Sequence, residues 1–394
     1  MSENFQALLA KIIDETRPVR SIDLTDLSDL ARNEIGSFGA AWALLNDSRR
    51  LDLATTLVEQ AEANIHLNFH AILRTFLSDP DPQVRRIAIE GLWEDERANL
   101  IAPLVGLLQD DPATEVRAAA ATSLGRFMLL GALGEIGDEM ARVAEEALHM
   151  AWYRAGEPVE VRRRALESLA YSSMPELHTL IQNAYFDENE LMRQSALFAM
   201  GRSTDRRWAR LVLAELGSPE PAMRFEAAIA AGEMALREAV QTLIRRLDDP
   251  DGGVREAATA ALGKIGGPVA KRALQALARS SDEALAQAAE DALDELNFGG
   301  EGWDDVLAGA DSAGPRDDEE DETDLEDDEL EGDELDAEML YEDDEFGDLA
   351  GEDFLDEEDA DFEFDDEEDG WDDEDLDDEA DGVDEDDEDD EDWN

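Results

Sequence analysis

A unit that returns every 31 residues constrains the fold of this chain more than any other feature. The last four steps between its anchor residues are each 31 residues long, and the anchors are Val84, Val116, Val161, Met192, Met223, Val254 and Leu285. Ala always follows four positions after the anchor, a small residue seven after, and an apolar residue eight after. These offsets share one face of an α-helix. Because one unit cannot bury that face alone, the period predicts a stacked helical array.

Each unit also contains a turn before its anchored helix. Five positions before the anchor, six of the seven copies have Asp or Ser, namely Asp79, Asp111, Asp187, Ser218, Asp249 and Ser280. Pro follows directly in four of them, and Asp or Ser with Pro is typical of a turn that starts a helix. A second apolar-periodic stretch precedes each turn, as in AVQTLIRRL at 239–247. We therefore predict an all-α chain built from helix–turn–helix units.

The repeat is clearest in DPDPQVRRIAIEGL (79–92), DPATEVRAAAATSLG (111–125), DENELMRQSALFAMG (187–201), SPEPAMRFEAAIAAG (218–232) and DPDGGVREAATAALG (249–263). This pattern resembles the HEAT family, specifically the bacterial HEAT-like repeats that are also found in phycobilisome lyases. The resemblance covers roughly residues 65–297. It implies an α-solenoid, a right-handed superhelix of helix pairs. Because such repeats serve many unrelated roles, the resemblance says little about function.

The repeat divides the chain into three expected parts. Residues 1–48 should form an N-terminal helical cap with helices at 4–16 and 25–45, and residues 49–298 the repeat solenoid. One step within the solenoid lengthens to 45 residues, which predicts a Gly-rich loop and a longer helix at 131–160. This insertion is either a tolerated length variant or a functional bulge, whose contacts would be Trp152 and Tyr153.

The third part, residues 299–394, is extremely acidic, and we call it the acidic segment. Residues 301–394 contain 55 Asp and Glu and one Arg, so 54 of the chain's 71 net negative charges lie there. Such charge density opposes collapse and predicts disorder. Eight aromatic residues interrupt the acids: Trp303, Tyr341, Phe346, Phe354, Phe362, Phe364, Trp371 and Trp393. The segment either binds a basic partner, with the aromatic residues as anchors, or only adds solubility.

An Arg follows the anchor in six repeats, and stacking predicts that the six lie in a row. This Arg row consists of Arg85, Arg117, Arg162, Arg193, Arg224 and Arg255. Two interpretations are open: each Arg pairs with turn acids of its own or the next repeat, or the row faces an anionic ligand. Direct nucleic-acid binding is not expected, because even residues 1–300 have a net charge of −17.

The residues offer little chemistry for catalysis. The chain has no Cys, which excludes disulfides, thiol catalysis and Cys-ligated metals. His66 and His70 are four apart on a predicted helix, but they lack the acid of the HExxH pattern. Among HEAT-type enzymes, deoxyhypusine hydroxylases hold di-iron through His-Glu pairs, and no His here precedes a Glu. We therefore expect no catalytic residue, metal or cofactor.

Together these observations predict a non-enzymatic protein–protein interaction scaffold, or a chaperone-like binder of a basic partner. The alternative is a HEAT-type enzyme related to phycobilisome (bilin) lyases. The first residues, MSENFQALLAKIIDETR, place acids among apolar residues, unlike a signal peptide. No stretch approaches the roughly 18 apolar residues that span a bilayer. We therefore expect a soluble, cytoplasmic protein without a membrane partner.

Overall fold

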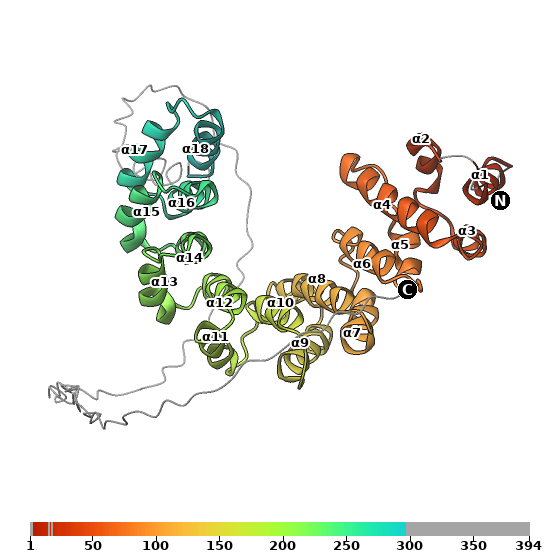
Figure 1. Ribbon diagram of the computed structural model, residues 1–394, viewed down its shortest axis with the longest axis horizontal. Helices are drawn as coiled ribbons and strands as arrows, with labels where there is room; N and C mark the ends of the chain where they lie inside the picture. Colours follow the sequence, from red (N-terminus) through yellow and green to blue (C-terminus); the bar gives the residue numbers. More distant parts are fainter. Residues whose placement is uncertain (1–2, 15, 17–18, 297–394) are drawn as a thin grey trace, which may run out of the picture. The chain divides into compact units, whose positions relative to one another are not determined.

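The computed structural model describes residues 3–14, 16 and 19–296 (Figure 1). The chain divides into two units, Met1–Asp317 and Asp318–Asn394, and the described residues all belong to the first. Every regular element among them is an α-helix or a short 3₁₀ helix, which confirms the all-α prediction. The acidic segment, its expected disorder and its eight aromatic residues lie outside the described residues.

After α1 (Glu3–Ile13), α2 (Ser21–Leu24) and the 3₁₀ helix η1 (Thr25–Leu27), the described chain forms eight successive helix pairs (Figure 1). They are α3 (Arg32–Trp42) and α4 (Asp47–Ala63), α5 (His70–Phe76) and α6 (Pro82–Gly91), α7 (Ile101–Asp110) and α8 (Thr114–Ala132), α9 (Asp138–Tyr153) and α10 (Val159–Leu169), α11 (Leu177–Tyr185) and α12 (Glu190–Ser203), α13 (Ala209–Glu215) and α14 (Pro221–Glu233), α15 (Val240–Arg246) and α16 (Gly252–Ile265), and α17 (Gly267–Leu277) and α18 (Glu283–Leu296).

The second helices of these pairs form a continuous layer. Each second helix, from α4 to α16, contacts the second helix of the following pair, and the layer ends at α18. Three 3₁₀ helices, η2 (Ala98–Leu100), η3 (Arg206–Trp208) and η4 (Arg237–Ala239), lead into the first helices α7, α13 and α15. The array of stacked units inferred from the 31-residue period is thus confirmed.

The turn between the helices of a pair is held by the predicted Asp. In the pair that contains α6, Asp79 Oδ1 accepts a hydrogen bond from Asp81 N at 2.9 Å. Asp81 is the N-cap residue of α6, and its Oδ1 accepts from Gln83 N at 2.8 Å. Pro82 occupies the first helical position, where no N–H is needed. The local sequence therefore sets both the turn and the start of the helix.

Small residues let neighbouring second helices approach closely. Gly232 lies on α14, and a Cβ added there would come within 2.9 Å of Ala261 Cα on α16. Gly201 and Gly263 take the same place one repeat earlier and later, and a Cβ at Gly201 would lie 2.7 Å from Ala230 Cα. In these cases the added Cβ would clash with the backbone of the neighbouring helix, which cannot move aside as a flexible side chain can. Glycine is therefore needed here for packing.

The N-terminal helices differ from the prediction. Helix α1 ends at Ile13 rather than at residue 16, and the single helix expected over 25–45 is broken between η1 and α3. At the break Asp29 has a φ of 53°, in the left-handed region. Asp29 N donates to Asn68 O at 2.9 Å, and Asn68 N donates to Ser28 Oγ at 3.0 Å. These loop–loop hydrogen bonds come from a distant segment, so helical periodicity could not reveal them.

The 45-residue step is accommodated by two long consecutive helices, the second helix of one pair and the first helix of the next. Helix α8 has 19 residues and α9 has 16, and residues 133–137 connect them. Trp152 is buried at 5% exposure, with the guanidinium carbon of Arg162 4.9 Å from its ring centroid. Trp152 would be a contact only under the functional-bulge alternative, and its burial in the core contradicts that role. Tyr153 is 58% exposed.

Candidate functional site

Five of the six Arg of the Arg row donate to backbone carbonyl oxygens in the turn of their own repeat. Arg85 shows the arrangement: its Nη1 donates to Asp79 O at 2.8 Å and to Pro80 O at 3.0 Å. Its Nε and Nη2 donate to the two carboxylate oxygens of Asp111, in the next turn, at 2.6 and 2.8 Å. One guanidinium thus joins two successive turns, and bidentate geometry makes such a pair strong.

Arg224 repeats this arrangement with still deeper burial. It donates to Asp249 Oδ2 at 2.9 Å and Oδ1 at 2.7 Å, and the two side chains are 8% and 0% exposed. The hydrogen bond from Arg224 lowers the pKa of Asp249, and the same bond raises the pKa of Arg224. Asp249 also accepts from Asp251 N at 3.1 Å. This carboxylate therefore holds its own turn and the preceding repeat together.

Where the next turn lacks the Asp, the carboxylate of a nearby Glu pairs with the Arg instead. Arg117 Nε donates to Glu157 Oε1 at 2.7 Å, one position after Gly156, which replaces the turn Asp. Arg193 Nη2 lies 3.7 Å from Glu220 Oε2. Four of the six guanidiniums in the Arg row thus face a carboxylate of the following repeat.

The two remaining members of the Arg row have different surroundings. Arg162 lies over the ring of Trp152, and Arg255 donates to Asp249 O at 2.9 Å and Pro250 O at 3.4 Å. The turn after Arg255 offers Ser280 instead of a carboxylate. The row is therefore a set of internal contacts between turns along most of its length.

The repeat pattern missed two residues that extend these contacts. Asp79 Oδ2 accepts from Trp42 Nε1 at 2.7 Å, and Arg50 Nε lies 3.3 Å from the same oxygen. Neither residue occupies the position directly after an anchor, so no periodic signal marks them. The sequence marks these two contacts only by the presence of an Arg and a Trp near the start of the array.

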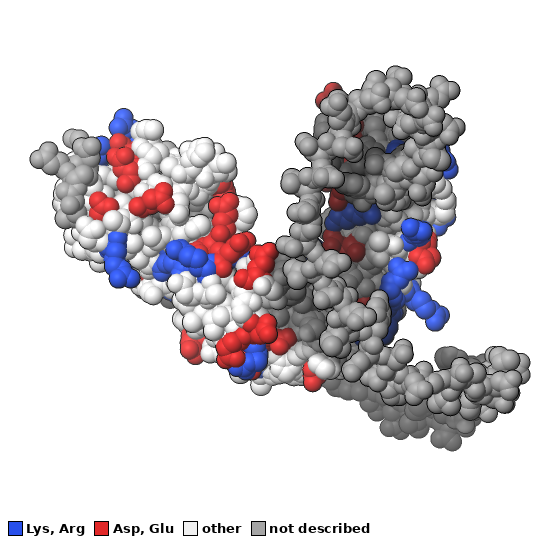
Figure 2. Space-filling model, turned by 180° about the vertical axis from the view of Figure 1, so that it is seen from behind, with Lys and Arg blue, Asp and Glu red and all other residues white. Residues whose placement is uncertain are grey.

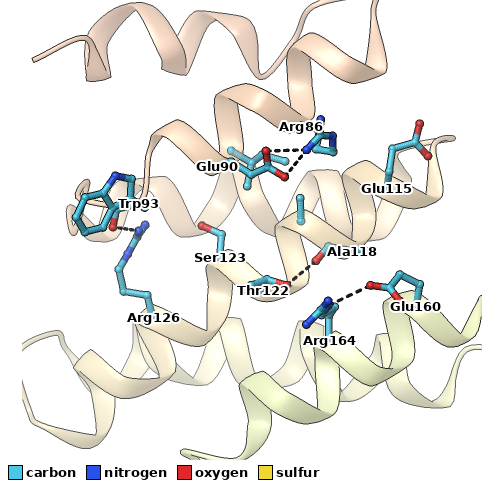
Figure 3. A pocket seen from close by; sticks show the side chains of 12 residues that line it. Arg86, Glu90, Trp93, Glu115, Ala118, Thr122, Ser123, Arg126, Glu160 and Arg164 are labelled. Carbon is cyan, nitrogen blue, oxygen red and sulfur yellow. Dashed lines mark hydrogen bonds and ion pairs between the residues drawn. The ribbon is translucent and has the colours of Figure 1, made fainter. Parts of the chain in front are cut away.

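A hollow of about 700 Å³ lies on the second helices α6, α8 and α10. We call it the second-helix groove; it is lined by Arg86, Ile89, Glu90, Trp93, Glu115, Ala118, Ala119, Thr122, Ser123, Arg126, Glu160 and Arg164. Figure 3 shows Trp93 and Arg126 at one end and Glu115 and Glu160 at the other. Its apolar lining comes from Ile89, Ala118 and Ala119, and Trp93 is 57% exposed.

Polar atoms at one end of the second-helix groove lack partners among the described residues. Arg126 donates to the carbonyl oxygens of Trp93 and Asp95, but its Nε is buried without a hydrogen bond. Ser123 Oγ is also buried and without a partner. Burial lowers the pKa of Arg126. Buried donors without partners cost free energy, so a ligand that accepts from them would gain by binding.

Farther along the second helices, Glu226 of α14 lies in a buried polar cluster. Its Oε2 has no partner among the described residues, and burial, followed by the charge of Glu167, raises its pKa to about 7. Glu167 Oε1 accepts from Ser195 Oγ at 2.6 Å, and Ser195 Oγ accepts from Arg163 Nε at 3.1 Å. The neighbouring acid therefore already uses the nearby donors.

This environment predicts a pH-dependent gain in stability for Glu226→Gln. The folded-state pKa of about 7 exceeds the ordinary value of 4.5, so the ionised carboxylate destabilises the fold above pH 7. This cost disappears as the pH falls below the ordinary pKa. We expect Glu226→Gln to raise the free energy of unfolding by about 1–3 kcal/mol near pH 8, and by much less near pH 5. Urea unfolding followed by circular dichroism at the two pH values measures this.

The control for that experiment is Glu256→Gln, at an exposed position on α16. It removes one carboxylate charge without changing a buried cluster, and surface substitutions of this kind change stability by less than about 0.5 kcal/mol. An equal gain at both pH values, or an equal gain in the control, would contradict the role of burial at Glu226.

The histidines do not form the predicted helical pair. His70 begins α5, whereas His66 lies in the connection after α4. Asn64 ends α4, and its Oδ1 accepts from His66 N at 3.0 Å, so the chain turns there. The prediction of one helix through both residues is therefore wrong. The described residues contain no group of three or more His, Asp or Glu that could hold a metal ion.

A family model supports the helical-repeat fold and leaves the activity open. The model of HEAT repeats matches residues 71–152 and 209–294. No curated protein matches the chain. None of the helices in the described part of the chain is long and apolar enough to cross a membrane.

Three solved structures illustrate the likeness. Human deoxyhypusine hydroxylase in complex with glycerol is 18% identical, with 75% of this chain and 96% of that chain covered and a TM-score of 0.30. The complex of CpcE and CpcF of phycocyanin lyase from Nostoc sp. PCC7120 is 18% identical, with 72% and 97% covered and a TM-score of 0.44. The Kap95:Nup1 complex is 11% identical, with 78% and 47% covered and a TM-score of 0.43. At these identities the likeness concerns the helical fold alone.

Proposed function

We propose that this chain, a HEAT-repeat protein, is a non-enzymatic scaffold or chaperone-like binder of a basic protein partner. It uses the second-helix groove and the acidic segment together. One observation carries the proposal: residues 301–394 have a net charge of −54, whereas residues 1–300 have a net charge of −17. A charge so concentrated attracts a basic partner over a distance and leaves the repeat array to make the specific contacts.

The second-helix groove supplies contacts that suit a peptide segment. Ile89 and Ala118 offer apolar surface, and the exposed indole of Trp93 can cover an apolar side chain. Glu115 is exposed at the opposite end, where it can pair with Lys or Arg. Aromatic residues in such hollows often dominate the binding energy of an interface. The groove thus complements the long-range attraction of the acidic segment.

The enzymatic alternative, a relative of bilin lyases, gains no support from the site. In the second-helix groove Arg86 pairs with Glu90 and Arg164 pairs with Glu160, so these four charged groups are already engaged. A reaction needs a nucleophile, acid or base held beside the substrate. We assign no catalytic residue, and a lyase assay with a bilin and its acceptor protein is the direct test of this alternative.

Capture from an extract of the source cells tests the binding proposal. We expect the full chain to retain basic proteins at low salt and to lose most of them near 1 M salt, where the Debye length is about 3 Å. Replacing the eight aromatic residues of the acidic segment by Ser should weaken retention at unchanged charge. Mass spectrometry identifies the retained proteins. Retention of mainly acidic proteins, or none, would refute the proposal.

The contribution of the second-helix groove to partner binding is measured with a matched pair of variants. Trp93→Ala should weaken binding of a captured partner by about tenfold or more, because truncated interface anchors cost about 2 kcal/mol. Tyr153→Ala is the control, since Tyr153 and Trp93 are 58% and 57% exposed and only Trp93 lines the groove. Calorimetric titration with the purified partner gives both affinities. Equal losses of affinity in the two variants would place the contact with the partner outside the second-helix groove.

A further inference from the structure

The first helices of the last three described repeats carry an excess of basic residues. We call this surface the basic face; it comprises residues 205–216, 235–248 and 266–279, which contain α13, α15 and α17. These segments hold nine Lys and Arg and four Asp and Glu, although residues 1–300 have a net charge of −17. Figure 2 shows Lys and Arg side chains close together over these repeats, at the right of the view.

Several of these side chains have no partner, unlike most of the Arg row. Arg210, Arg237, Arg272 and Arg279 are exposed, and none of their side chains makes a hydrogen bond or an ion pair with another described residue. Arg210 and Arg272 are 62 residues apart, which is two repeat periods, so they occupy equivalent positions. Stacked repeats present equivalent positions on the same side. Cationic groups therefore line one side of the array and remain available.

The acids within the basic face are partly engaged. Asp205 pairs with Arg207, and Glu215 accepts a hydrogen bond from Tyr185 Oη at 2.6 Å. The third segment, 266–279, contains no acid at all. An anionic ligand would therefore meet little local repulsion here, in contrast to the Arg row, where carboxylates already hold most of the guanidiniums.

We propose that the acidic segment of the same chain docks on the basic face. The acidic segment follows directly after α18, which packs against α17 and α16. A flexible coil of the same length, 96 residues, has an end-to-end distance of about 50–60 Å. Three stacked units extend only about 25–30 Å. The segment is thus tethered beside the face and long enough to cover it.

Chemistry favours this occupant over others. The acidic segment brings 54 net negative charges at the high local concentration of a tethered ligand. Its aromatic residues can stack on exposed guanidiniums, a contact worth about 0.5–1 kcal/mol at exposed sites. An outside anion must first approach a chain whose net charge is −71. The tethered segment carries 54 of these 71 net negative charges itself, so it is opposed only by the net charge of −17 on residues 1–300.

Docking has a consequence for binding. An acidic segment held on the basic face is unavailable to a basic partner, so the partner must displace it. This regulatory role rests on the proposed function, whereas docking itself does not. The test below contains no partner, so its failure and the failure of the binding proposal are separate results.

A single spin label on the full chain tests docking. Because the chain has no Cys, Gly332→Cys places a nitroxide at one position in the acidic segment. At low salt we expect broadening of the methyl NMR signals of α13, α15 and α17, and no broadening on α3 to α7. Near 1 M salt, where the Debye length is about 3 Å, most of the broadening on α13, α15 and α17 should vanish. Unbroadened signals on the three helices at low salt would overturn the proposal, as would broadening confined to the second-helix groove.

Matched charge-reversal variants establish which surface is used. Arg210→Glu, Arg237→Glu and Arg272→Glu combined should abolish most of the broadening. The control, Lys11→Glu, Arg32→Glu and Arg142→Glu combined, changes the net charge equally at exposed positions outside the face and should retain it. Equal loss in both variants would mean nonspecific attraction. Labelled chains mixed with isotope-enriched unlabelled chains should show no broadening; broadening there would assign the contact to a second copy and overturn docking within one chain.

Discussion

Replacing Arg224 by Met should lower the free energy of unfolding by about 3–5 kcal/mol, because it leaves a buried carboxylate without its main cation. Asp249 is fully buried, and only Arg246 Nη1, at 3.2 Å, would remain as an ion-pair partner. Urea unfolding followed by circular dichroism measures the loss. Hydrogen exchange should rise first in α14 and α16, because each unit of an array depends on its neighbours.

Two further variants separate charge from packing in that experiment. Adding Asp249→Asn to Arg224→Met removes the unpaired charge and should recover part of the lost stability, while the Asn side chain can still accept from Asp251 N. Arg142→Met, which breaks exposed pairs with Glu139 and Glu146, should lower the free energy of unfolding far less than Arg224→Met does. If Arg224→Met costs no more than Arg142→Met, the contacts between turns do not stabilise the array.

Opposite stability changes are expected for the same substitution at two helical glycines. Gly232→Ala should lower the free energy of unfolding by about 1–3 kcal/mol, since its Cβ would lie 2.9 Å from the backbone of α16 and force the repeats apart. Gly106→Ala on α7 should raise it by about 0.5–1 kcal/mol, because no atom lies within 4 Å of the new Cβ and Ala favours the helix. Thermal and urea unfolding of both variants give the two signs.

The comparison between the two glycines isolates the effect of packing. Both substitutions add one methyl group within an α-helix and gain the same intrinsic helix propensity. A difference in sign can therefore come only from the neighbouring repeat. A gain in stability at Gly232 would mean that the second helices can separate at little cost, and that close packing does not hold the stack together.

Local patterns were sufficient to predict the helical repeat. Val84, Ala88 and Leu92 are buried with no exposed surface, as their spacing on one helix face requires. Asp79 and Asp81 set the turn and the helix start through bonds that span two residues. Such contacts lie within a few positions along the chain, so sequence periodicity records them. The break at Asp29 was missed because its partner, Asn68, lies in another segment.

The Arg row could be located but not interpreted from the sequence. Periodicity placed Arg85 next to an anchor, but its partner Asp111 is 26 residues away, and Arg117 reaches 40 residues to Glu157. Whether a guanidinium meets a carboxylate of the next repeat depends on the length of that repeat and on the residue in its turn. Only the stacked structure shows these pairings.

The sequence by itself determined the helix–turn–helix unit, its buried face, its turns and the concentration of acids in residues 301–394, because each depends on neighbouring residues or on composition. The tertiary structure alone decided which charges are satisfied and which remain open. Arg224 and Arg272 are both arginines on array helices, yet one is buried against Asp249 and the other is exposed without a partner among the described residues. The physical reason is that charge pairing and groove formation depend on distances between repeats.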